Sequence, residues 1–161
     1  MSGRAGPGPQ SALATTAALQ SALAAEHAAV YGYGVVGANL SGSKQATAMT
    51  DWVAHQVARD ALEAMLRSRG AQPVAAAVAY QLPVTVRTPG QAASLAVILE
   101  DRVATAYLGL VALSSPSIRK FGALQVRAAA LRAAFWRGST VAFPGLPASA
   151  LTAPRQPEPG P

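Results

Sequence analysis

Two glutamates lie at the centres of segments that consist otherwise mainly of alanine, leucine and valine. Glu26 lies in ALAAEHAAVYGYG at 22–34, and Glu100 lies in AASLAVILEDRVATAY at 92–107. A carboxylate in such surroundings has to be paired with a cation, bound to a metal or protonated, because an isolated charge in a protein core is costly. These two acids are therefore the first candidates for chemistry in this chain.

The surroundings of the two glutamates repeat. Each is followed by a tyrosine seven residues later and by an arginine 33 or 32 residues later. The two sets are Glu26, Tyr33 and Arg59, and Glu100, Tyr107 and Arg132. The repeat predicts two helix hairpins of one design, each with a carboxylate midway along one helix and a cation on the returning helix. His55 lies near the level of Glu26 in the first hairpin.

One kind of centre that these residues could form is a metal-free ion-pair core, and this is the one we favour. Arginine is the cation best suited to buried bidentate pairs with carboxylates, and tyrosine hydroxyls can complete the hydrogen bonds. No cofactor is then expected, and the biochemical activity stays unassigned. The expected members are Glu26, Tyr33, His55, Arg59, Glu100, Tyr107 and Arg132.

A second kind of centre is a metal site holding iron or manganese, in an oxidoreductase or an iron-handling protein. Helical bundles with two metals use Glu from two helices and Glu-x-x-His from the other two. Here the residue three before His55 is Trp52, and the ligand set is smaller than the roughly six, mostly oxygen, ligands of a hard dication. The candidate ligands are Glu26, Asp51, His55, Glu100 and Gln125. A third possibility is a pocket in which the same cluster recognises a small polar molecule.

Apolar periodicity and turn signals define the elements that hold these residues. Helices are expected at about 11–39, 44–69, 91–113 and 116–137, with a turn at 39–43, a Ser115-Pro116 start and a Gly138 stop. The segment 70–90 contains three prolines and has the length of a crossover. This pattern predicts an all-α, ferritin-like antiparallel four-helix bundle with one long crossover between helices 2 and 3. The bundle would span 11–138, between a disordered arm at 1–10 and a proline-rich tail at 139–161.

Composition excludes several functional classes. The chain has 161 residues, 51% of them hydrophobic and none of them cysteine, so we expect one domain with a core and no disulfide or thiolate chemistry. The net charge is +6, but the basic residues are scattered without interleaved aromatics, so nucleic-acid binding is not expected. No segment offers the ~20 strongly apolar residues of a membrane span, and no convincing signal peptide is present. We expect a cytoplasmic protein.

Association is expected as well. Exposed helix faces of small residues rarely stay unpaired, so the sequence predicts a homodimer through one helix pair. Trp52, Phe121, Phe135 and Trp136 are interpreted as packing residues of the core or of that interface. A dimeric scaffold or partner-binding module is therefore a further functional class.

The chain also resembles a ferritin-like domain family of unknown function from high-GC Gram-positive bacteria. The residues that carry the resemblance are ALAAEHAAVYGYGVVG at 22–37, the pattern H-x-x-x-R-D from His55 to Asp60, LED with Tyr107, and AAFWRGSTVAFPGLP at 133–147. The resemblance covers roughly residues 12–147. It implies a ferritin-like bundle and no established activity. Ferritins and their relatives oxidise or store iron, but this sequence lacks their paired Glu-x-x-His motifs.

Overall fold

Four helices make up most of the described chain. The computed structural model describes residues 8–113 and 115–146, and no strand occurs among them. The helices are α1 (Pro9–Ala38), α2 (Gly42–Arg67), α3 (Pro89–Val111) and α4 (Pro116–Arg137). The predicted all-α class is confirmed, and each predicted helix is found within two residues of its expected ends. None of the described helices combines the length and the apolar character needed to cross a membrane.

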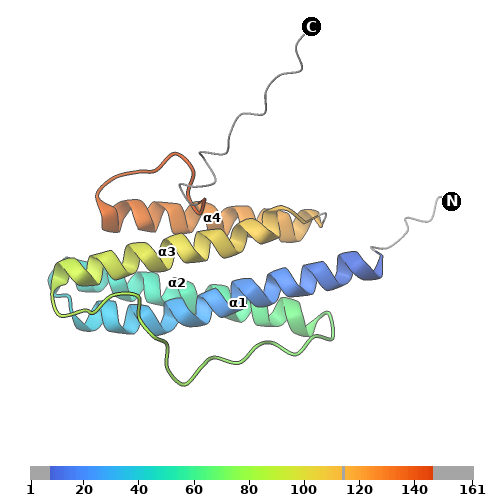
Figure 1. The fold of residues 1–161 in the computed structure, drawn as a ribbon, viewed down its shortest axis with the longest axis horizontal. Coiled ribbons are helices and arrows are strands. Elements are labelled where there is room, and N and C mark those ends of the chain that lie inside the picture. Colours follow the sequence, from blue (N-terminus) through green and yellow to red (C-terminus); the bar gives the residue numbers. More distant parts are fainter. Residues whose placement is uncertain (1–7, 114, 147–161) are drawn as a thin grey trace, which may run out of the picture.

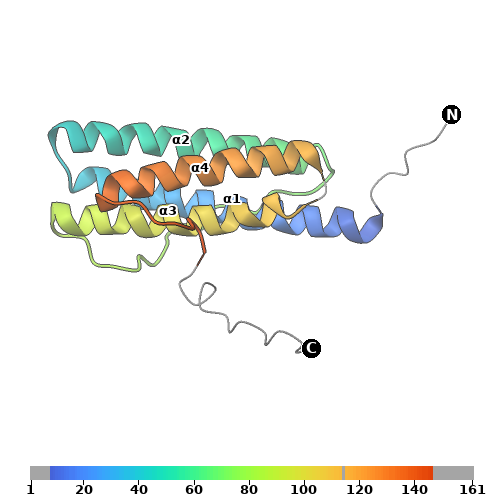
Figure 2. The same ribbon diagram turned by 90° about the horizontal axis from the view of Figure 1, so that it is seen from above.

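The two ends of the chain lie largely outside the described residues. This applies to 1–7 of the expected arm and to 147–161 of the expected tail. α1 begins at Pro9 rather than Ser11, so the last two residues of the expected arm belong to the helix. Residues 139–146 are described, and they run back from the end of α4 alongside α3 (Figure 2).

The helices lie side by side, and Figure 1 shows their directions. α1 and α4 run one way, and α2 and α3 run the other way. The close helix pairs are α1 with α2, α1 with α3, and α3 with α4. Residues 68–88 connect the end of α2 to the distant start of α3 and run along α1, where Gln20 Nε2 donates to the carbonyl of Gln72 at 2.7 Å. His27 Nε2 lies 3.0 Å from the carbonyl oxygen of Val74, so this histidine also faces the connection.

Local signals fix where the helices begin and end. Thr88 caps α3 by accepting a hydrogen bond from the Gln91 amide at 3.2 Å, and Pro89 occupies the first turn. Pro116 begins α4 in the same way, although Ser115 at the cap position makes no side-chain capping bond. Gly138 ends α4 with a φ of 77°, a left-handed conformation that glycine adopts without a Cβ penalty.

Two apolar clusters fill the bundle, one toward each end, and a polar layer separates them. Gly32 brings α1 close to α3 beside this layer, since a Cβ there would lie 2.5 Å from Leu99 Cδ1. The largest aliphatic members are Leu19, Leu23, Leu62, Leu66 and Leu110 in one cluster, and Val36, Leu40, Leu95 and Leu99 in the other. The polar layer is therefore enclosed by packed side chains on both sides.

Candidate functional site

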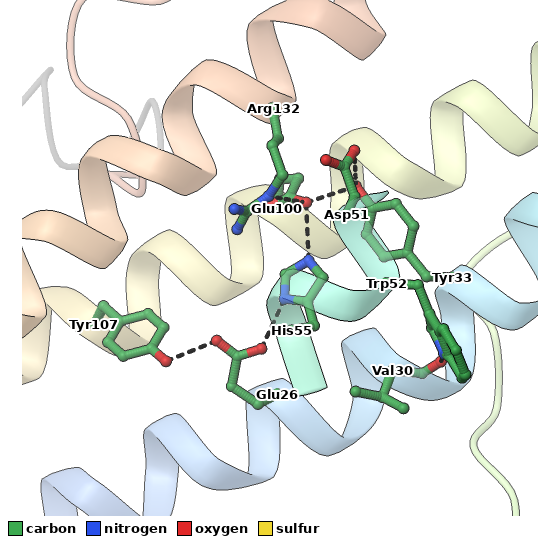
Figure 3. Close-up of polar contacts among 9 residues, drawn as sticks. All are labelled: Glu26, Val30, Tyr33, Asp51, Trp52, His55, Glu100, Tyr107 and Arg132. Atoms are coloured by element: carbon green, nitrogen blue, oxygen red, sulfur yellow. Dashed lines mark hydrogen bonds and ion pairs between the residues drawn. The ribbon is translucent and has the colours of Figure 1, made fainter. Parts of the chain in front are cut away.

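The polar layer brings together residues from all four helices (Figure 3). Glu26 of α1, His55 of α2 and Glu100 of α3 are 0% exposed, and Arg132 of α4 reaches them from the side. The side chains that meet here are Glu26, Tyr33, Asp51, His55, Glu100, Tyr107, Arg132 and Trp136. They form the candidate site, which we call the central cluster.

His55 is the middle of the central cluster. Its Nδ1 lies 2.7 Å from Glu26 Oε2, and its Nε2 lies 3.0 Å from Glu100 Oε1. Both nitrogens face carboxylate oxygens, so both have to donate, and only the protonated imidazolium can do so. Burial by itself lowers the pKa of His55, but the hydrogen bonds and charges of Glu100 and Glu26 outweigh it and raise the pKa to about 9. An imidazolium therefore bridges the two carboxylates at neutral pH.

The two tyrosines complete the hydrogen bonds of the carboxylates. Tyr107 Oη donates to Glu26 Oε1 at 2.7 Å, and Tyr33 Oη donates to Glu100 Oε1 at 2.5 Å. Burial, and then the neighbouring carboxylates, raise the pKa of both phenols well above the usual range. Both side chains are therefore neutral donors, and neither serves as a base.

The two carboxylate oxygens of Glu100 differ in their hydrogen bonding. Its Oε1 accepts from three donors, because Arg132 Nε adds a bond of 2.9 Å to those of Tyr33 and His55. Its Oε2 is buried without a partner among the described residues. Burial by itself raises the pKa of Glu100, but the hydrogen bonds and charges of His55 and Arg132 reverse that effect and hold the pKa below its usual value. Burial by itself lowers the pKa of Arg132, but the charge and the hydrogen bond of Glu100 outweigh burial and raise the pKa above its usual value, so the pair is ionic.

Two members of the central cluster were not among the residues expected in the ion-pair core. Trp136 Nε1 donates to Asp51 Oδ2 at 2.9 Å, and Tyr33 Oη lies 3.4 Å from the same oxygen. Burial raises the pKa of Asp51. From the sequence Asp51 was only a candidate metal ligand, and Trp136 only a packing residue. A signal was present, because Trp136 lies one helical turn after Arg132 and a buried indole N–H usually requires an acceptor.

Arg59 lies outside the central cluster, which corrects its predicted place there. Its Nε and Nη2 bind Oδ1 of the adjacent Asp60 at 2.9 and 2.8 Å, and the side chain is 28% exposed. His55 and Tyr107 each bind one oxygen of Glu26, and the partly exposed guanidinium of Arg59 binds Asp60 instead. The sequence allowed either Arg59 or His55 as the cation beside Glu26, and the structure places His55 there. Gln125 is half-buried on α4 and makes no hydrogen bond to the described residues of the cluster.

Comparison with known proteins assigns the chain to a family. Residues 18–148 match the family described as Domain of unknown function (DUF4439). The chain belongs to this family. A solved structure, that of a conserved hypothetical protein, rv2844, from Mycobacterium tuberculosis, is similar, with 35% identity and a TM-score of 0.76. The match covers 78% of this chain and 96% of that one. No curated protein matches the chain. The predicted membership in a family of unknown function is confirmed.

The residues of the central cluster do not fit a bound iron or manganese ion. Both nitrogens of His55 point at carboxylates, so neither presents a lone pair to a cation. Within residues 8–113 and 115–146, no group of three or more His, Cys, Asp or Glu side chains is arranged to hold a metal. Glu100 Oε2 is uncommitted, but a single oxygen falls far short of the several ligands that a hard dication requires.

Proposed function

We propose that this protein is a metal-free member of the ferritin-like bundles, in which the central cluster serves as a structural core. The helix directions and the long connection from α2 to α3 support the ferritin-like assignment, since one crossover between two antiparallel pairs is characteristic of that topology. The resemblance of the sequence points the same way. A cytoplasmic location stays a prediction, which fractionation of cells that express the chain would test.

One observation carries the proposal: the His55 ring lies between Glu26 and Glu100 and bonds to both. Metal-carrying bundles neutralise such carboxylates with cations at the centre. Here an imidazolium and the Arg132 guanidinium supply the positive charge. Because Glu26, His55 and Glu100 are fully buried, a substrate has no access to them. The function best supported is that of a stable module that acts through its surface.

Metal addition should leave the protein unchanged. Protein purified without chelators should contain no stoichiometric iron or manganese, and either ion should leave the Tm of the wild type where it was. A site filled at a hundredfold excess over its Kd would add about 2.7 kcal/mol, enough to raise Tm by several degrees. Differential scanning calorimetry makes the measurement. A Tm increase in the wild type that is absent in Glu26→Ala would favour the alternative, a degenerate metal-binding oxidoreductase or iron-handling protein.

The proposal includes a homodimer formed through α2 and α4. Pro116–Arg137 contains no acidic residue and exposes Lys120 and Arg127. In a two-fold dimer with α2 of each copy on α4 of the other, these α4 cations do not face one another across the interface. Both helices also expose large apolar side chains suited to such a contact: Met49, Val53 and Val57 on α2, and Leu124, Leu131 and Phe135 on α4.

Leu131→Asp should convert the dimer to a monomer, because it places a charge in the centre of the apolar contact. Sedimentation velocity at micromolar concentrations measures the change, and circular dichroism verifies that the variant is folded. Leu13→Asp is the matched control, since Leu13 is 71% exposed but lies on α1, and it should stay dimeric. A wild type that sediments as a monomer at high micromolar concentration would contradict the proposed association.

A further inference from the structure

A pocket outside the central cluster lies between α3 and the segment that follows α4. Its volume is about 570 Å³, within the range of small-molecule sites. Ile98, Arg102 and Thr105 of α3 form one side of it. The other side is the segment 141–146, which runs back beside α3 (Figure 2). This pocket has no part in the proposed structural role of the bundle.

The segment that forms the outer side is anchored to α3. Thr105 Oγ1 donates to the carbonyl oxygen of Gly145 at 2.6 Å. Gly145 has a φ of 81°, and a Cβ there would lie 2.9 Å from the backbone of Ala104 and Thr105. Only glycine allows the two backbones to come this close. This contact fixes the segment 141–146 beside α3.

The anchored segment presents apolar side chains that the described part of the chain leaves exposed. Val141, Phe143 and Leu146 are 45%, 56% and 46% exposed, and all three line the pocket. Ile98 adds a half-buried apolar surface from α3. Such a concentration of exposed apolar area within six residues is suited to contact with an apolar ligand.

The polar groups of the pocket leave one cation in excess. Asp101 Oδ2 and Arg137 Nη2 form an ion pair of 2.7 Å, so their charges cancel. Arg102 is exposed and forms no ion pair within the described chain. Its guanidinium is free to make charge-assisted hydrogen bonds to an acidic ligand group, which are among the stronger polar contacts.

We propose that this pocket binds a small amphiphilic anion, with its acidic group on Arg102 and its apolar part against Phe143 and Leu146. The ligand class is an apolar chain or ring that carries a single carboxylate. The charge of Arg102 selects the acid, and the anchored segment selects the apolar part. Neither feature contributes to the core of the bundle.

Calorimetric titration of the full chain with decanoate, below its micelle concentration, tests this site. Decanoate should bind, and decanol, which lacks the charge, should bind at least about tenfold more weakly, as expected for loss of a charge-assisted contact. Arg102→Gln should weaken the binding of decanoate to a similar extent. Arg87→Gln, an exposed arginine of the connection, is the matched control and should bind like the wild type.

Two further variants test the apolar part and the anchor. Phe143→Ser removes apolar surface and should weaken the binding of decanoate and of decanol to the same extent. Gly145→Ala forces the segment away from α3 and should abolish binding, while circular dichroism should show an intact bundle. The site is refuted if decanoate does not bind at millimolar concentration, or if it binds equally well to Arg102→Gln, Phe143→Ser and the wild type.

Discussion

Glu26→Ala is expected to lower the free energy of unfolding by about 3–5 kcal/mol, the usual cost of removing one partner from a buried ion pair. Glu26 is fully buried and accepts hydrogen bonds from His55 and Tyr107. Alanine would leave His55 Nδ1 and the Tyr107 hydroxyl without acceptors and would open a cavity beside them. Urea denaturation at pH 7 measures the loss.

Three comparisons separate the buried charge from a general effect of substitution. Glu26→Gln should cost less, because the amide keeps the shape and its oxygen can still accept a hydrogen bond. Asp60→Ala removes an exposed carboxylate from α2 and should cost less than about 1 kcal/mol. Replacing Glu26 and His55 together by apolar residues should recover much of the loss, since neither charge is then stranded. If Glu26→Ala unfolds like Asp60→Ala, Glu26 does not hold a buried charge.

The helices and the buried acids could be predicted because their signals are local. Proline and glycine mark the helix ends through their own backbone restrictions, as at Pro116 and Gly138. Glu26 and Glu100 were recognisable because a carboxylate in an apolar helix segment demands compensation wherever the helix packs. Such features depend on the residue and its immediate neighbours, so they can be predicted from the sequence.

The choice of cation could not be predicted in the same way. His55 and Arg59 lie one helical turn apart on the same stripe of α2, and either could reach the level of Glu26. Which one enters the core depends on the space left by Tyr107 and by the neighbouring helices. The short imidazole fits between two carboxylates, whereas the long arginine side chain can reach water and does so.

Interactions between segments far apart in the chain could not be predicted from the sequence either. The bond between Trp136 and Asp51 joins residues 85 positions apart, and its partners were visible only as an aromatic and an acid. The contact of Gly145 with α3 likewise lies in a stretch whose prolines predicted an extended tail. Periodicity places side chains on helix faces, but it does not specify which faces meet at which level.

Stability is expected to fall as the pH rises from about 6.5 to about 9. Burial, the largest single effect, lowers the pKa of His55. The hydrogen bonds and charges of Glu100 and Glu26 together outweigh it and raise the pKa from 6.5 to about 9 on folding. A raised pKa means that the folded state binds the proton more tightly. The resulting stabilisation is complete below pH 6.5 and is lost as the pH passes through the folded pKa. A difference of this size corresponds to about 3 kcal/mol.

The direction of this change distinguishes His55 from the overall charge of the protein. The net charge is +6, so a rising pH reduces the positive charge and its self-repulsion, which by itself would stabilise the fold. Denaturation of the wild type across this range should nevertheless show a loss. His55→Gln removes the titrating ring and should abolish this loss of stability, whereas His27→Gln should keep it. In the His27→Gln variant the remaining histidine can be followed by NMR, and its midpoint in the folded state should lie near 9. A ring that is neutral at pH 7, together with a flat profile in the wild type, would place the shared proton on a carboxylate and contradict the imidazolium bridge.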